Sequence, residues 1–202
     1  MENKFKNKNK QIGILLTNLG TPDSPTAKGL KKYLNEFLMD RRVVDLPRIF
    51  WVPLLKLIIL NVRPRKSAKI YKAIWTDDGS PLLSFSKSIL KELTSNFKEV
   101  DPKITLENGM RNGNQSNKDA LNNFKEKTIS KILVLPLYPQ AGSPTTTSTF
   151  DAINNHIKDQ SWVPNIRFVS GYHDNDDYIE LSLIHISEPT RPLYISYAVF
   201  CL

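Results

Sequence analysis

The sequence predicts an α/β protein in which helices flank a parallel sheet. Four short apolar runs have the length and composition of buried strands, namely QIGILLTNLG (11–20), ITLENGM (104–110), KILVLPL (131–137) and NIRFVS (165–170). Segments with helical periodicity fill the gaps between these runs. Strands that alternate with helices in this way favour a parallel sheet with right-handed crossovers.

The helices are predicted by apolar side chains that recur at intervals of three and four residues. The segment 26–39 has five such side chains on one face, which are Leu30, Tyr33, Leu34, Phe37 and Leu38. The same spacing predicts helices over 85–97 and 117–129, and a shorter helix over 148–157. No internal repeat interrupts this alternation, so one α/β domain is expected.

Four loops follow the four strands, and the carboxyl ends of parallel strands meet at the sheet edge where ligands bind. These loops are TNLGTPDSP (17–25), MRNGN (110–114), PLYPQAGSP (136–144) and GYHDND (171–176). Their Gly, Pro, Asn and Ser content is typical of loops that expose backbone groups. None has the glycine spacing or the Lys of a phosphate-binding loop, which disfavours a nucleotide site.

The charge of the chain is positive and uneven. Its 202 residues have a net charge of +8, and the segment 40–72 has nine basic residues against two acidic ones. This excess indicates either an anionic partner (nucleic acid, a lipid surface or a carboxylate ligand) or a solvated face. A single Cys excludes a disulfide framework and a Cys-based zinc site. The Lys-rich segment 1–10 is expected to be a disordered basic tail with no secretory signal.

An apolar segment lies within the basic region. Between Ile49 and Val62, leaving out Pro53, only Lys56 and Asn61 are not apolar, and arginines flank the segment. It is too short to span a bilayer. Core packing is the default interpretation, and the flanking arginines favour two others, a cap over a hydrophobic pocket or a helix on a membrane surface.

Five motifs in series carry a resemblance to a known family. In order they are LLTNLGTPDSP, FLMDRRVVDLPR, IYKAIWTDDGSPL, GMRNGN and LPLYPQ…TTTSTFD. Together they resemble ferrochelatase from about residue 12 to about residue 180. The resemblance implies one of the two similar α/β domains of a chelatase, with the first of these domains over 11–180. It also implies insertion of ferrous iron into protoporphyrin IX to give haem, the last step of haem biosynthesis.

The resemblance implies four porphyrin-binding residues. Arg41 in MDRRV would pair with a propionate, Tyr71 and Ser80 would be further porphyrin contacts, and Arg111 in GMRNGN would face the cleft. The apolar segment would form the lip of the porphyrin slot, which meets the membrane in some family members. A flat apolar ring with anionic propionates does require an apolar slot with guanidinium groups at its rim.

Three of the four assignments have a structural alternative. Arg41 could be a surface charge near a helix C-terminus, Ser80 a helix cap before Pro81, and Tyr71 a core residue. At two positions the chain departs from the family pattern, because Asn112 and Ala141 stand where aromatic residues are common. These departures remove ring-stacking surface from the expected cleft.

No catalytic or metal-binding residue is expected in this chain. The family uses a His and a later Glu in segments that this chain lacks, and we therefore expect an inactive fragment. His173 is expected at a helix start, where Asp174 or Asn175 is the N-cap, and His156 is expected on the surface.

Porphyrin and ferrous iron are expected as substrates, with no bound cofactor and no nucleic-acid partner. The expected location is the cytoplasm, with peripheral contact to the inner membrane as an option. A chelatase for another tetrapyrrole or metal, and a non-enzymatic basic module that binds anions or a membrane surface, are the alternatives.

The end of the chain breaks the pattern. LSLIHISEPTR and ISYAVFCL are what two parts of a transposase-type sequencing adapter encode, in one continuous frame with a short barcode between them. We therefore expect 181–202 to be a non-native, adapter-derived tail. His185 and Cys201, which lie in this tail, would then have no functional meaning.

Overall fold

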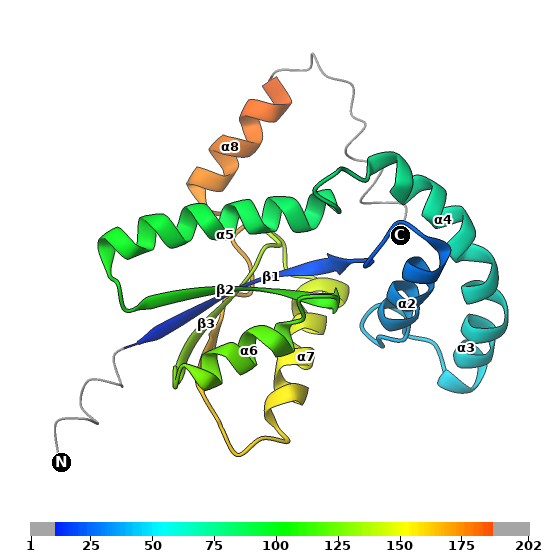
Figure 1. Cartoon of the computed structure of the whole chain (residues 1–202), viewed down its shortest axis with the longest axis horizontal. Coiled ribbons are helices and arrows are strands. Elements are labelled where there is room, and N and C mark those ends of the chain that lie inside the picture. Colours follow the sequence, from blue (N-terminus) through cyan, green and yellow to red (C-terminus); the bar gives the residue numbers. More distant parts are fainter. Residues whose placement is uncertain (1–10, 188–202) are drawn as a thin grey trace.

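The computed structural model describes residues 11–187 and has a four-stranded parallel sheet at its centre (Figure 1). The strands are β1 (Ile12–Thr21), β2 (Ile104–Gly113), β3 (Lys131–Pro136) and β4 (Asn165–Phe168), in the spatial order β2-β1-β3-β4. All four predicted strands are therefore present, and the predicted fold class is confirmed.

Strand β1 is the centre of the sheet. It pairs in parallel with β2 on one side and β3 on the other, so that Leu15 lies beside both Glu107 and Val134. Its residues from Gly13 to Thr17 are all buried, as a strand covered on both faces must be.

Helices cover both faces of the sheet. On one face α5 (Pro81–Val100) contributes Leu90, Leu93 and Phe97 to a cluster with Ile14, Leu16 and Leu106. On the other face lie α6 (Asn117–Glu126) and α7 (Ser148–Ile157), whose apolar side chains pack against Leu15 and Val134 (Figure 1). The last described helix is α8 (Asp176–Ser187).

Helix boundaries differ from the predictions where capping decides them. Helix α5 begins four residues earlier than predicted, with Pro81 in its first turn. Helix α6 ends at Glu126 and not at Ile129, because Thr128 has a positive φ of 60° and the Ile129 N–H bonds to the Phe124 carbonyl at 2.9 Å.

A group of helices gathers at the end of the sheet toward which the arrows of β1 and β2 point (Figure 1). It consists of α2 (Ala27–Leu38), α3 (Arg48–Leu54), the π-helix η2 (Leu55–Ile59) and α4 (Leu60–Ile74). All five apolar residues predicted to share a face of the first helix are buried in its core. The Trp51 Nε1–H donates to the Leu38 carbonyl at 2.8 Å, which fixes α3 against the end of α2.

Among residues 11–187, no helix has both the length and the apolar character needed to cross a membrane. The expected disordered tail at 1–10 lies outside the described residues. The same holds for 188–202, the larger part of the expected adapter-derived tail.

Candidate functional site

The loops that follow the four strands converge, as the parallel sheet predicts. The Asn112 side-chain amide donates to the Leu19 carbonyl at 3.1 Å, which joins the ends of β2 and β1. The Tyr172 N–H donates to the Pro139 carbonyl at 2.9 Å, which joins the loops after β4 and β3. At Gly20, with φ 103°, a Cβ would lie 1.9 Å from the Asn112 carbonyl oxygen, so only glycine allows this approach.

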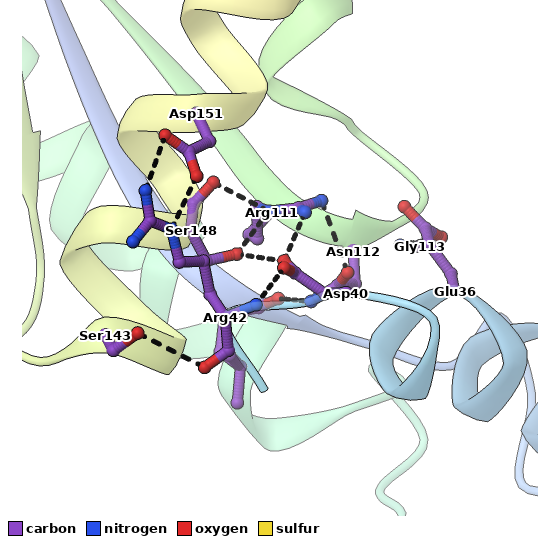
Figure 2. A network of polar contacts seen from close by, with 10 residues as sticks. Glu36, Asp40, Arg42, Arg111, Asn112, Gly113, Ser143, Ser148 and Asp151 are labelled. Atoms are coloured by element: carbon purple, nitrogen blue, oxygen red, sulfur yellow. Dashed lines mark hydrogen bonds and ion pairs between the residues drawn. The ribbon is translucent and has the colours of Figure 1, made fainter. Parts of the chain in front are cut away.

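A charged network occupies this edge of the sheet (Figure 2). The Arg111 Nη2 lies 2.5 Å from the Asp40 Oδ2, and the two side chains are only 17% and 9% exposed. The Ser148 hydroxyl donates to the same Asp40 oxygen, and Arg111 Nε donates to the Ser148 carbonyl at 3.0 Å. One carboxylate thus joins the loop after α2 to the end of β2 and the start of α7.

The pKa of Asp40 reflects this environment. Burial alone would raise the pKa of the carboxyl group. The hydrogen bonds from Ser148 and from the Arg42 N–H, together with the Arg111 charge, outweigh burial and hold the pKa below its usual value. Asp40 is therefore a carboxylate at neutral pH, as the Arg111 ion pair requires.

A second ion pair holds the next part of the same loop (Figure 2). Arg42 Nε lies 2.7 Å from the Asp151 Oδ2, and Arg42 Nη2 lies 3.4 Å from Oδ1. The Ser143 hydroxyl donates to the Arg42 carbonyl at 3.3 Å. The loop is thereby tied to α7 and to the π-helix η3 (Ser143–Thr147) that precedes it.

The four residues implied as porphyrin contacts have different surroundings. Arg41 is exposed and has no side-chain partner among residues 11–187, whereas Arg111 is engaged in the partly buried charged network. Tyr71 is partly buried against the core of the α2–α4 group, and this burial raises the pKa of its phenol. Ser80 is buried at the N-cap position of α5. Its side chain forms no cap hydrogen bond and instead accepts from the Thr21 hydroxyl at 2.7 Å.

The apolar segment packs into a core by one face only, so the default interpretation from the sequence holds for part of the segment. Only three of its side chains, Trp51, Leu55 and Leu60, are buried. Six others are exposed, among them Ile49 (77%), Phe50 (74%) and Leu57 (72%). We call these six residues the apolar lip. They are Ile49, Phe50, Leu54, Leu57, Ile58 and Val62.

The two described histidines lie apart from this edge network. His173 is exposed, and the side chain of Asn175 accepts from the Tyr178 N–H at 3.1 Å, which confirms a helix N-cap two residues beyond the histidine. His156 is partly exposed and lies beside Asn122 and Gln160, so it is less exposed than expected but still at the surface. Within 11–187 no three His, Cys, Asp or Glu side chains are placed to hold a metal ion.

Sequence reasoning missed the charged network. Asp40, Ser148, Arg42 and Asp151 were not singled out as functional residues. The partners are 71 residues apart in the Asp40–Arg111 pair and 109 residues apart in the Arg42–Asp151 pair. The sequence has no local signal for this network, because the paired side chains lie on segments that are far apart in the chain. The departures at Asn112 and Ala141 differ in the structure, since Asn112 is buried between strands and Ala141 is exposed.

The fold defines a class of protein, an α/β domain with an open parallel sheet, in which ligands generally bind beyond the carboxyl ends of the strands. The ferrochelatase family model matches residues 11–194, and the chain belongs to the ferrochelatase family. The match runs past residue 180 into the segment expected to be adapter-derived, whose origin stays a prediction.

Individual ferrochelatases agree with the family match. The ferrochelatase of Pseudoalteromonas atlantica is 43% identical over 179 residues, which cover 88% of this chain and 50% of that protein. The ferrochelatase of Thioalkalivibrio sulfidiphilus is 46% identical over 170 residues, which cover 84% of this chain and 46% of that protein. The chain spans about half the length of the curated relatives it matches.

Proposed function

We propose that this chain is the N-terminal domain of an enzyme that inserts ferrous iron into protoporphyrin IX to give haem. The observation that carries the proposal is the apolar lip, which is exposed next to the loop of Arg41, an exposed arginine with no side-chain partner among residues 11–187. In this proposal porphyrin and ferrous iron are substrates, and the protein has no resident cofactor.

The surfaces of the domain suit the two parts of a porphyrin. The ring is flat and apolar, and the side chains of the lip provide apolar surface that the rest of the domain leaves uncovered. The propionates are carboxylates, for which a guanidinium group is the best-matched partner. We assign Arg41 to a propionate, with Tyr71, Ser80 and Arg111 as further contacts.

Arg41→Ala tests the assignment in the 202-residue chain. Loss of a charge-assisted hydrogen bond should weaken protoporphyrin binding by about 1.5–3 kcal/mol, measured by quenching of porphyrin fluorescence. Arg167→Ala is the matched control, because Arg167 is exposed on the edge strand β4 and lines a hollow with Ile12 and Lys131, the first residues of β1 and β3. It should leave the affinity unchanged. An unchanged affinity in Arg41→Ala contradicts the assignment.

The chain alone should not insert iron. Insertion requires a base for the pyrrole protons and a second wall for the cleft, and His173 is exposed beside the start of α8. Purified chain incubated anaerobically with ferrous iron and protoporphyrin should form haem no faster than the protein-free mixture. Faster formation that His173→Ala abolishes would contradict this expectation.

Two other readings have observations in their favour. The apolar lip together with the basic residues of α4 favours peripheral contact with the inner membrane of a cytoplasmic protein. A groove of about 490 Å³ between α2 and α4, lined in part by Lys28, Lys31, Lys32 and Lys56, favours a non-enzymatic anion-binding module. Flotation with vesicles of anionic lipid tests the first, and Leu57→Ser should reduce it. Binding of inorganic phosphate with no porphyrin binding would favour the second.

The specificity for porphyrin and for metal can be tested directly. Competition between protoporphyrin and coproporphyrin, and between iron and other divalent metals in a full-length homologue, would detect a chelatase of another specificity.

We also propose that 181–202 is adapter-derived. Deletion of these residues should leave solubility unchanged or improved, whereas cooperative loss of the fold would contradict that origin.

A further inference from the structure

Two adjacent arginines in the loop after α2 have opposite environments. Arg42 is paired with Asp151 through two nitrogen atoms and has its carbonyl bonded by Ser143. Arg41 is exposed and lacks a side-chain partner in the described part of the chain. The loop therefore uses one arginine for attachment to α7 and leaves its neighbour available to a ligand.

The backbone around Arg41 is fixed from both sides. Asp40 Oδ1 accepts from the Arg42 N–H at 2.8 Å, and the Asp40 carbonyl accepts from the N–H groups of Val43 and Val44 at 3.2 and 3.0 Å. The Asp40 N–H itself donates to the Phe37 carbonyl at 3.3 Å, which continues from the end of α2. These bonds hold the segment 40–44 as a compact turn with Arg41 inside it.

The turn is also fixed relative to the sheet. Asp40 Oδ2 is bonded by Arg111 of β2 and Ser148 of α7, and Asp151 lies one helical turn further along α7 (Figure 2). Two carboxylates thus attach the loop to elements that carry the strand ends of the candidate site. These bonds therefore hold the backbone of Arg41 in one position at this edge of the sheet.

We infer that Asp40 and Asp151 are positioning residues that hold Arg41 ready for a carboxylate of the ligand. The inference rests on the proposed function, because it takes Arg41 as the partner of a propionate. An arginine on a fixed turn loses less conformational freedom on binding than one on a mobile loop. A fixed turn therefore lowers the entropic cost of binding and increases the affinity for the ligand. Arg42 is unsuited to the same role, since a ligand would have to displace Asp151 from it.

A double-mutant cycle in the 202-residue chain tests this role. The first variant is Asp151→Asn, because the Arg42–Asp151 ion pair is the more exposed of the two and its loss leaves the Asp40–Arg111 pair in place. We expect binding of protoporphyrin IX to weaken about 3- to 10-fold, the range of one ordered side chain. Binding of the protoporphyrin dimethyl ester, which has no carboxylates, should not change. In an Arg41→Ala background the effect of Asp151→Asn should disappear.

Asp40→Asn should give a larger effect with the same selectivity for the free acid. Glu107→Gln is the matched control, since it removes an acid that pairs with Lys127 from the middle of β2. Thermal unfolding of each variant shows whether the fold is retained. If Asp40→Asn does not fold, Asp151→Asn decides the question by itself.

The outcomes separate this inference from the proposed function. If Arg41→Ala leaves protoporphyrin binding unchanged, the propionate assignment fails, and the inference fails with it. If Arg41→Ala weakens binding but Asp151→Asn has the same effect in both backgrounds, the assignment stands and the positioning role is refuted. Equal weakening for the acid and the ester would also refute it, because that pattern reports general damage to the site.

Discussion

Two apolar regions of this domain differ in what covers them. On the α6–α7 side of the sheet, Leu121, Phe124 and Ile153 are each at most 1% exposed, packed against β1 and β3. In the apolar lip, side chains of the same kind are exposed, and no other described element covers them. Both regions have large apolar side chains, Leu, Ile and Phe among them, so cover by another element and not residue type alone makes a core.

Phe124→Ala should break the covered region and has the largest expected effect. The ring is fully buried and lies so close to β1 that a Cβ at Gly13 would be 2.9 Å from its Cε1 atom. Truncation would leave a cavity under the central strand and should lower the free energy of unfolding by about 3–5 kcal/mol. Urea denaturation measures this, with Phe50→Ala in the lip as the control. Equal losses in the two variants would contradict the comparison.

Asp40→Asn tests how much the charged network contributes to the free energy of unfolding, in comparison with the covered region. The change leaves Arg111 without its charged partner, at 17% exposure, and should cost about 1–3 kcal/mol of stability at pH 7. Glu107→Gln, which breaks a more exposed ion pair, should cost less than about 1 kcal/mol.

The stability difference between wild type and Asp40→Asn should depend on pH. The pKa of Asp40 is lower in the folded protein than its usual value of about 3.9, so the carboxylate contributes stability above that pH. That contribution is lost as the pH falls through the folded pKa, because both states then bind the proton. The difference between wild type and Asp40→Asn should therefore be constant from about pH 5 to 7 and shrink below about pH 4. A difference that persists unchanged in acid would contradict the ionic role of Asp40.

The sequence predicted the covered region better than the edge. The strands, and helices such as α2 and α7, follow from local periodicity, and Thr26 and Asn175 cap helices by contacts within three residues. The pairs Asp40–Arg111 and Arg42–Asp151 join distant segments, so no local pattern predicts them. The exposure of the lip was misjudged for a related reason, since burial depends on a covering surface that the segment itself does not encode.

Polar substitution in the lip should have the smallest effect on stability and so sharpens the comparison. Phe50 and Leu57 are 74% and 72% exposed, so Phe50→Ser and Leu57→Ser remove little buried area. We expect each to change the free energy of unfolding by less than about 0.5 kcal/mol, the range of ordinary surface substitutions. Contiguous exposed apolar side chains promote association, and both variants should therefore lower self-association in sedimentation velocity. Loss of more than about 2 kcal/mol would mean that the lip belongs to the core after all, because only buried side chains carry costs of that size.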